Sequence, residues 1–180
     1  MSHDKIGSFT VLAQLGTGAG SEVFHIRRVA DELEFALKMV SVESRSHLRY
    51  VAQLQQEFYV GQLLDHPNLI KMYALETETD WLFRPKKAKL LLELAPGRPA
   101  HQLPQLSPCR LLRVFEQAAD ALSYMHSQGV LHADVKPDNV IVGPRDTVKV
   151  IDFGLAGFSG DQETRVHGTP EYMAPETKLR

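Results

Sequence analysis

Three polar side chains in the second half of the chain have the types and the spacing that metal-assisted group transfer needs. Asp134 and Asn139 lie in one polar segment, and Asp152 lies beyond two short apolar runs at 140–142 and 148–151. The apolar runs indicate a hairpin, which would bring the three side chains to the ends of neighbouring strands. One carboxylate could then meet a substrate hydroxyl while the other carboxylate and the amide oxygen hold a metal ion. Turn-forming roles for the aspartate and the asparagine are the alternative.

A glycine-rich turn lies between two predicted strands near the N-terminus. The segment 16–23 reads Gly-Thr-Gly-Ala-Gly-Ser-Glu-Val, and glycines allow backbone N–H groups to approach phosphate oxygens closely. An ordinary hairpin turn is the alternative. The segment differs from the pattern G-x-G-x-x-G-x-V in two ways: Ser21 stands at the third glycine position, and an extra glycine, Gly20, precedes it. Val23 matches the valine of the pattern. A dinucleotide-binding turn is excluded because a strand, not a helix, follows.

A lysine within an apolar strand could complete a phosphate site. The segment 35–38 reads Phe-Ala-Leu-Lys, and Glu57 on the following predicted helix could hold the Lys38 ammonium by a charge-assisted bond. A surface lysine on an edge strand and a solvated helix glutamate are the alternatives. Gly61, one turn after Glu57, disfavours that helix by roughly 1 kcal/mol relative to alanine.

The hydrophobic pattern predicts the elements that position these residues. Alternating apolar and polar residues predict strands at 9–15, 22–29, 34–42, 69–76 and 89–94. A helix is expected from about residue 47 to 64, and a second from Ser107 and Pro108 to Gly129, with a cap residue and a proline at its start. An apolar stripe on the second helix consists of Leu111, Leu112, Phe115, Ala118, Ala119, Leu122 and Met125. The segment 95–99 indicates a linker, so we expect a small sheet lobe before residue 96 and a helical lobe after it.

The composition excludes several classes of protein. Hydrophobic residues make up 43% of the 180 residues and charged residues 23%, which is typical of a globular protein with a core. The net charge of −2 gives no electrostatic reason to expect nucleic acid as a partner. No apolar run approaches the roughly 18 residues of a membrane helix, so no membrane segment is expected. Cys109 is the only cysteine, which excludes an intrachain disulfide and is consistent with a cytoplasmic setting.

The motifs, taken in order, carry a specific resemblance to a known family. The segment 132–139 reads His-Ala-Asp-Val-Lys-Pro-Asp-Asn, the segment 152–154 reads Asp-Phe-Gly, and the segment 168–176 ends in Ala-Pro-Glu. With the glycine turn and the lysine before them, they resemble a eukaryotic-like serine/threonine protein kinase domain, over nearly the whole chain. The resemblance implies ATP and Mg²⁺ as cofactors and phosphoryl transfer to Ser/Thr hydroxyls of protein substrates.

The resemblance also implies a fold and its division. We expect an α+β, bilobal protein-kinase-like fold in which residues 1–95 form an N-terminal lobe of antiparallel sheet with one helix. Residues 96–180 would form a partial, mainly helical C-terminal lobe. A kinase of this family continues with further helices, so we expect a fragment, with a natural truncation or completion by another chain or domain as the alternatives.

The resemblance assigns catalytic and metal-binding roles to particular residues. Asp134 would orient the substrate hydroxyl as it attacks the γ-phosphate, and Lys136 would neutralise charge on that phosphate. Asn139 and Asp152 would hold the magnesium ions. Lys136 and Thr169 are similar to the residues of serine/threonine kinases and differ from the tyrosine-specific pattern, which predicts a Ser/Thr acceptor.

The resemblance assigns nucleotide binding to residues of the glycine turn, the lysine strand and its partner helix, the linker, and the strand after the catalytic loop. These residues are Leu15, Gly16, Thr17, Gly18, Ala19, Gly20, Ser21, Val23, Ala36, Lys38, Glu57, Leu92, Glu93, Ala95 and Ile141. Lys38 would contact the phosphates, Leu92 would line the back of the adenine pocket, and the linker backbone would hydrogen-bond to adenine.

One departure from the family pattern bears on regulation, and two other functions remain open. Ala133 stands where the family usually has an arginine that pairs with a phosphorylated activation segment. We therefore expect phosphorylation of Ser159 or Thr164 to change activity little. Ala133 and Gly61 leave open a pseudokinase-like module that binds nucleotide without catalysis. A small-molecule kinase of the aminoglycoside or choline type shares some motifs, although Lys136 and the segment 168–176 favour protein substrates.

Overall fold

The structure of the chain is a computed structural model that describes residues 5–18, 20–160 and 168–175. Its contacts divide the chain into two compact units. The first consists of Met1–Phe58 and Lys71–Leu94, and the second of Tyr59–Ile70 and Ala95–Arg180. Residues 59–70 thus group with the second unit although they precede the linker, and the expected division of the chain after residue 95 stays a prediction.

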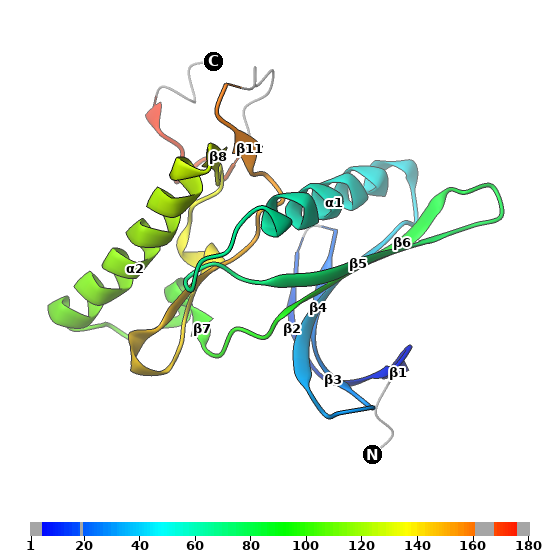
Figure 1. Ribbon diagram of the computed structural model, residues 1–180, viewed down its shortest axis with the longest axis horizontal. Helices are drawn as coiled ribbons and strands as arrows, with labels where there is room; N and C mark the ends of the chain where they lie inside the picture. Colours follow the sequence, from blue (N-terminus) through cyan, green and yellow to red (C-terminus); the bar gives the residue numbers. More distant parts are fainter. Residues whose placement is uncertain (1–4, 19, 161–167, 176–180) are drawn as a thin grey trace. The chain divides into compact units, whose positions relative to one another are not determined.

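The first unit is built on a curled antiparallel sheet of six strands in the order β1-β2-β3-β4-β6-β5 (Figure 1). The strands are β1 (Lys5–Ile6), β2 (Phe9–Thr17), β3 (Glu22–Arg28), β4 (Glu34–Ser41), β5 (Met72–Thr79) and β6 (Pro85–Glu93). Side chains alternate along β6, where Ala88, Leu90 and Leu92 are buried and Lys87 and Lys89 are half-buried. This period of two is what a sheet with one covered face requires.

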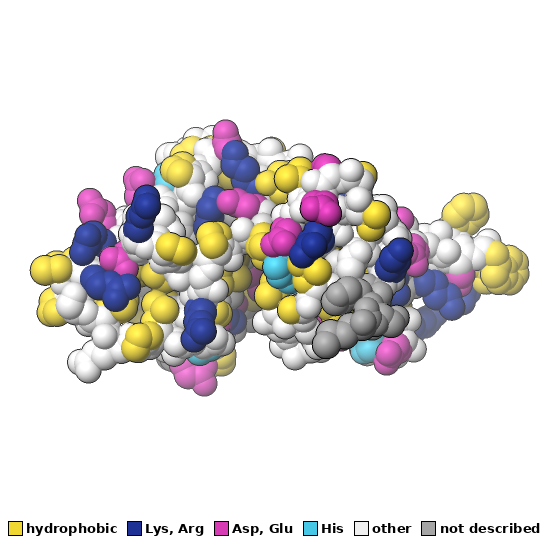
Figure 2. Space-filling view, turned by 90° about the horizontal axis from the view of Figure 1, so that it is seen from below, with side chains coloured by type: hydrophobic (Ala, Val, Ile, Leu, Met, Phe, Trp, Pro, Cys, Tyr) yellow, Lys and Arg dark blue, Asp and Glu magenta, His cyan; other side chains and the backbone are white. Residues whose placement is uncertain are grey.

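The hairpin of β5 and β6 is longer than the sequence predicts. Strands were expected at 69–76 and 89–94, but pairing continues to Thr79 and Pro85. Asp80 closes the hairpin because its Oδ1 accepts hydrogen bonds from the N–H groups of Leu82, at 2.8 Å, and Arg84, at 2.9 Å. Hydrophobic side chains gather at the far end of this hairpin in the space-filling view (Figure 2), where Trp81 is 84% exposed. The residues that extend the two strands, 77–80 and 84–87, are mostly polar, so no alternation of apolar residues indicated how far the pairing continues.

Helix α1 (Leu48–Gln62) follows a short 3-10 turn, η1 (Arg45–His47), and lies along the sheet in Figure 1. It begins and ends within two residues of the predicted bounds. Val51, Leu54 and Val60 are buried at helical spacing, and Glu57 is buried among them. The chain then turns at His66, whose carbonyl oxygen accepts a hydrogen bond from Leu69 N.

The second unit contains helix α2 (Pro108–Ser127) and two small sheets. One sheet has the order β10-β9-β7 and the other pairs β11 with β8. The strands are β7 (Arg98–Pro99), β8 (Val130–Leu131), β9 (Val140–Val142), β10 (Val148–Val150) and β11 (Gly157–Phe158), and three 3-10 turns are η2 (Ala100–Gln102), η3 (Pro137–Asn139) and η4 (Pro144–Asp146). The α+β fold class predicted from the sequence is confirmed, and the predicted hairpin of residues 140–151 corresponds to β9 and β10.

Helix α2 buries a narrower face than the predicted stripe. Val114, Ala121 and Met125 are buried, whereas Leu112 is 68% and Phe115 is 62% exposed within the described chain. The expected cap is also only partly present. Ser107 has the extended backbone of a cap residue, but its side chain makes no capping hydrogen bond. Its carbonyl oxygen accepts the first helical bond, from Leu111 N at 2.9 Å.

The side chain of Gln117 ties α2 to the hairpin of β9 and β10. Its Oε1 accepts hydrogen bonds from Asn68 Nδ2 and from Val148 N, both at 3.2 Å. Its Nε2 donates to the carbonyl oxygens of Asp146, at 2.7 Å, and Arg113, at 3.0 Å. One amide therefore satisfies backbone groups of two elements far apart in the sequence. Neither helix within the described residues has the length and apolar character needed to cross a membrane.

Replacing Gln117 by alanine should lower the free energy of unfolding by about 1–3 kcal/mol, because the change leaves the buried N–H of Val148 without its partner. Urea unfolding at neutral pH measures this difference. Gln128→Ala is the matched control, since the exposed Gln128 amide donates to the side chain of its neighbour Ser127. It should change stability by less than about 0.5 kcal/mol. Equal losses in the two variants would contradict the assigned role.

Candidate functional site

The residues singled out from the sequence fall into two groups, one in each unit, and each group is described by itself. The first group surrounds the glycine turn and the lysine of β4. The second surrounds the loop that follows β8 and the turn that follows β10. Ala19 lies outside the described residues, as do Thr164 and Glu176.

The glycine turn is tighter than expected because β2 continues through Gly16 to Thr17. Gly16 pairs with Val23 and Thr17 with Glu22, and Gly18 N donates to Ser21 O at 2.7 Å. Leu15 lies at an irregularity in this pairing and is 52% exposed. The turn therefore presents backbone with little side-chain cover, as a loop that approaches phosphate must.

Lys38 and Glu57 form an ion pair between β4 and α1. Lys38 Nζ lies 2.7 Å from Glu57 Oε2, and the side chains are 16% and 3% exposed. A carboxylate buried to this degree is stable only when it is paired, and removing either partner would leave a buried charge. The partnership proposed from the sequence is present, and Lys38 is also the neighbour of Val23 across the β3–β4 pairing.

The other residues assigned to the nucleotide lie on strands of both units. In the first unit Ala36 and Leu92 are opposite each other on β4 and β6 and are buried. Glu93 is fixed to Lys71, because Glu93 N donates to Lys71 O at 2.9 Å and Lys71 N donates to Glu93 Oε2 at 3.2 Å. In the second unit Ile141 lies on β9.

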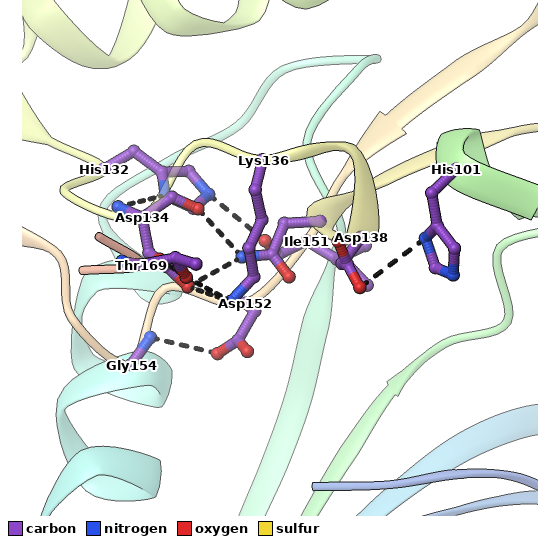
Figure 3. Close-up of polar contacts among 10 residues, drawn as sticks. His101, His132, Asp134, Lys136, Asp138, Ile151, Asp152, Gly154 and Thr169 are labelled. Carbon is purple, nitrogen blue, oxygen red and sulfur yellow. Dashed lines mark hydrogen bonds and ion pairs between the residues drawn. The ribbon is translucent and has the colours of Figure 1, made fainter. Parts of the chain in front are cut away.

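Asp134 is the centre of the second group. Its Oδ2 accepts from Lys136 Nζ at 2.7 Å, and its Oδ1 accepts from the hydroxyl and the backbone N–H of Thr169 at 2.7 Å and 3.0 Å. Lys136 Nζ also donates to the Thr169 hydroxyl oxygen at 2.9 Å, and Figure 3 shows all three side chains directed toward one another. The sequence gave Thr169 only a part in acceptor choice, and its contact with Asp134 was not predicted.

The electrostatics of this group keep Asp134 ionised. Burial alone would raise the pKa of its carboxyl group, but the hydrogen bonds from Lys136 and Thr169 outweigh burial and hold the pKa below the ordinary value of 3.8. At neutral pH the carboxylate is therefore available to accept a further hydrogen bond, and the Lys136 ammonium lies beside it.

Asn139 and Asp152 flank the hairpin of β9 and β10, and Asn139 bonds to Asp134. Asn139 is 5% exposed, and its Nδ2 donates to the carbonyl oxygen of Asp134 at 2.9 Å and to its Oδ2 at 3.2 Å. Ile151 N donates to Asn139 O at 2.9 Å, and Asp152 is the next residue along the chain after this bond. No group of three or more His, Cys, Asp or Glu side chains that could hold a metal ion occurs among the described residues. The amide and carboxylate oxygens of Asn139 and Asp152 are the donor types that Mg²⁺ prefers.

The buried ring of His132 connects the loop that carries Asp134 to the backbone at Ile151. It is 2% exposed, its Nε2 donates to Ile151 O at 3.1 Å, and its Nδ1 accepts from Asp134 N at 3.3 Å. Its ring meets the fully buried Phe153 edge-on, with centroids 5.7 Å apart. Burial lowers its pKa below the ordinary 6.5, so His132 is neutral at pH 7. The sequence placed His132 in a motif without giving it this role.

The backbone around Ala133 explains how Thr169 reaches Asp134. Ala133 has a φ of 62°, and a side chain at Gly168, where φ is 113°, would lie 2.7 Å from the Ala133 carbonyl oxygen. Only glycine allows this approach. Gly168 thus lets the segment that carries Thr169 lie directly against the loop of residues 132–139.

Comparisons with known proteins place the whole chain, not its individual site residues, among its relatives. A family model described as the protein kinase domain matches residues 9–178. The chain is 35% identical, over 93% of its length, to serine/threonine-protein kinase pkn3 of Myxococcus xanthus. It is 30% identical, over 97% of its length, to CBL-interacting protein kinase 11 of Oryza sativa subsp. japonica and to CBL-interacting serine/threonine-protein kinase 9 of Arabidopsis thaliana.

The chain belongs to the protein kinase domain family, which confirms the resemblance found in the motifs. It spans 33% of the length of the Myxococcus relative and 36% and 40% of the lengths of the two plant relatives. The shared region is therefore the part that carries the two groups of residues described above.

Replacing Thr169 by valine should raise the pKa of Asp134, because the variant loses the hydroxyl donor. The folded-state pKa of the parent lies below the unfolded value, so Asp134 contributes stability above about pH 4 that is lost as the pH falls through the folded pKa. The stability difference between parent and variant should accordingly be larger at pH 7 than at pH 3.

Carboxyl ¹³C NMR titration of Asp134 and urea unfolding at the two pH values measure these effects. Thr147→Val is the control, since the Thr147 hydroxyl donates to a backbone carbonyl oxygen, that of Pro144. An unchanged Asp134 titration in Thr169→Val would refute the proposed origin of the lowered pKa.

Proposed function

We propose that this domain transfers the γ-phosphoryl group of ATP to Ser/Thr hydroxyls of protein substrates. The observation that carries the proposal is the Asp134 carboxylate, kept ionised and held in place by Lys136 and Thr169. Membership in the protein kinase domain family supports the same reaction.

In this proposal Asp134 accepts a hydrogen bond from the substrate hydroxyl and directs its oxygen toward the phosphoryl group. Proton transfer to this carboxylate late in the reaction is compatible with its low pKa, because the acceptor becomes basic only as the new bond forms. Lys136, which donates to Asp134 Oδ2 at 2.7 Å, supplies positive charge beside the oxygens that gain negative charge. Catalysis then depends on positioning and electrostatic stabilisation.

Asn139 and Asp152 are proposed to hold magnesium. The ion, when bound, neutralises the phosphate oxygens and holds them in a defined orientation. The residues present fit this role because the Asn139 amide nitrogen is committed to Asp134, which turns the amide oxygen the other way.

The glycine turn and Lys38 are proposed to bind the phosphates of the nucleotide. The Lys38 ammonium, oriented by the buried Glu57 carboxylate, is suited to contact two phosphate oxygens at once. In the first unit, Ala36 and Leu92 supply apolar surface for adenine, and backbone groups near Glu93 supply hydrogen bonds. A Ser/Thr acceptor is supported by the contacts of Lys136 with Thr169 and by the printed names of the relatives. The single Cys109 supports a cytoplasmic setting.

A nucleotide-binding module without catalysis is the second candidate, and Ala133 is the observation that favours it. Alanine offers no cation to a phosphorylated activation segment, so the usual route for stabilising that segment is missing. The direct bonds of Thr169 to Asp134 favour catalysis instead, because they hold part of the segment without phosphate.

Thermal unfolding of the chain alone, with ATP, and with ATP and magnesium tests the proposal. ATP at 100 times its dissociation constant should add about 2.7 kcal/mol of stability, and magnesium should add more. Asp152→Asn should abolish the magnesium increment while Asp120→Asn, a change at a residue whose side chain is 70% exposed, should retain it.

Phosphotransfer to a mixed Ser/Thr/Tyr peptide library, followed by phosphoamino-acid analysis, separates the two candidates. If the domain is a kinase, the products are phosphoserine or phosphothreonine. Asp134→Asn should then lower the rate by at least about 100-fold while ATP binding is retained. Stabilisation by ATP without any phosphotransfer would favour the binding module. Phosphotyrosine as the sole product would rule out the proposed acceptor.

A further inference from the structure

The ring of Tyr50 occupies the space where a side chain on Gly20 would lie. A methyl group built on Gly20 would be 2.1 Å from Tyr50 Cδ2, 2.3 Å from Cε2 and 2.5 Å from Cγ. These distances are far below van der Waals contact. The backbone of Gly20 is outside the left-handed region, so the ring, and not the torsion angle, requires glycine at this position.

The other glycines of the same turn have no such neighbour. A methyl group on Gly16 would meet nothing within 4 Å, and one on Gly18 would meet only Ser21, whose Oγ would lie at 3.2 Å and backbone O at 3.8 Å. The close approach is therefore specific to Gly20, which is the extra glycine by which the turn departs from the family pattern. The ring of Tyr50 leaves no room for a side chain at this position.

Tyr50 is itself held by its surroundings at the beginning of α1. The Arg49 guanidinium lies 4.6 Å from the centroid of the Tyr50 ring, and its Nη2 donates to the Tyr50 hydroxyl at 2.6 Å. The His47 ring is 6.0 Å away, and His47 Nδ1 lies within hydrogen-bond distance of Ser41 O and Glu43 N. The ring is thus anchored to the junction of β4 and α1 and cannot move aside without breaking these contacts.

Helix α1 consequently contacts two parts of the first unit that the proposed function uses. Near its start Tyr50 packs on the glycine turn, and in its second half Glu57 pairs with Lys38. Both contacts lie within one unit, and the helix between them is continuous. A displacement of α1 would alter the turn and the lysine together.

We infer that Tyr50 is a positioning residue for the glycine turn: it fills the space of the side chain that Gly20 lacks and fixes the turn to α1. The inference rests on the proposed function to the extent that the turn binds ATP phosphates. Loss of the ring leaves the turn in more conformations, only some of which present its N–H groups to phosphate. ATP affinity should then fall, while turnover at saturating ATP, which depends on Asp134, should change less.

A double-mutant cycle of Gly20→Ala and Tyr50→Ala tests the inference with two measurements, thermal unfolding without nucleotide and the Kd for Mg·ATP from calorimetry. In the parent, Gly20→Ala should lower the unfolding temperature and weaken Mg·ATP binding by at least roughly threefold, an effect of the size found for residues in direct contact. In the Tyr50→Ala background the same change should have little effect on either quantity, because the space is open.

Two further variants serve as controls. Tyr50→Phe keeps the ring and loses only the hydroxyl that accepts from Arg49, so it should stay much closer to the parent than Tyr50→Ala in both measurements. Tyr50→Ala should raise the KM for ATP more than it lowers kcat. Gly16→Ala, whatever the size of its effect, should act equally in the two backgrounds. If Gly20→Ala prevents folding, the comparison of Tyr50→Ala with Tyr50→Phe still decides whether the ring governs ATP affinity.

Equal costs of Gly20→Ala with and without the Tyr50 ring would overturn the inference. Coupling seen in unfolding but not in ATP affinity would also overturn it, since Tyr50 would then only pack against the turn. A parent chain that binds no ATP would overturn the proposed function and the nucleotide part of the inference, while the unfolding cycle would still decide whether ring and glycine are coupled.

Discussion

The carboxylate of Asp134 is the constraint on which the organisation of the second unit depends. A partly buried charge requires donors, and it receives them from Lys136, from both donor groups of Thr169 and from the Asn139 amide. Lys136 and Asn139 belong to the same loop as Asp134, whereas Thr169 comes from a segment 35 residues further along the chain. The loop must therefore fold back on itself, and the segment after Gly168 must lie against it, before the charge is satisfied. The donors that stabilise the carboxylate also set its orientation, so the contacts that fold this loop are the same contacts that the proposed function needs.

The same principle applies to the other buried acids. Glu57 is paired with Lys38, and Arg110 donates two hydrogen bonds to Asp146 Oδ1, which lowers the pKa of that carboxyl group. No buried side-chain nitrogen or oxygen among the described residues lacks a hydrogen-bond partner. Glu57 lies next to groups proposed to bind phosphate, whereas Asp146 lies in a turn beside α2. Burial of a paired acid alone therefore does not identify a functional site, and the chemistry of the neighbouring groups does.

Much of this arrangement follows from the sequence, and the rest fails to follow for identifiable reasons. The strands around the glycine turn and helix α1 were predicted because their apolar residues repeat regularly. The strands β7, β8 and β11 were not predicted, since two residues cannot show a period. The contact of Thr169 with Asp134 depends on the tight approach at Gly168, and the contact of Tyr50 with Gly20 joins a helix to a turn. Neither contact leaves a local signal, because each depends on segments brought together only by folding.

The backbone of the loop is in the left-handed region at Ala133, and the bonds of neighbouring residues hold it there. Its φ of 62° is unfavourable for any residue with a Cβ atom, by roughly 1 kcal/mol, so an arginine there would bear the same cost. The conformation is maintained by its neighbours, through the bonds of His132 to Ile151 and of Asn139 to Asp134. Replacement of arginine by alanine can thus remove a phosphate receiver without altering the orientation of the carboxylate. In the proposed function, loss of the arginine would therefore affect pairing with a phosphorylated segment and leave the backbone that orients Asp134 in place.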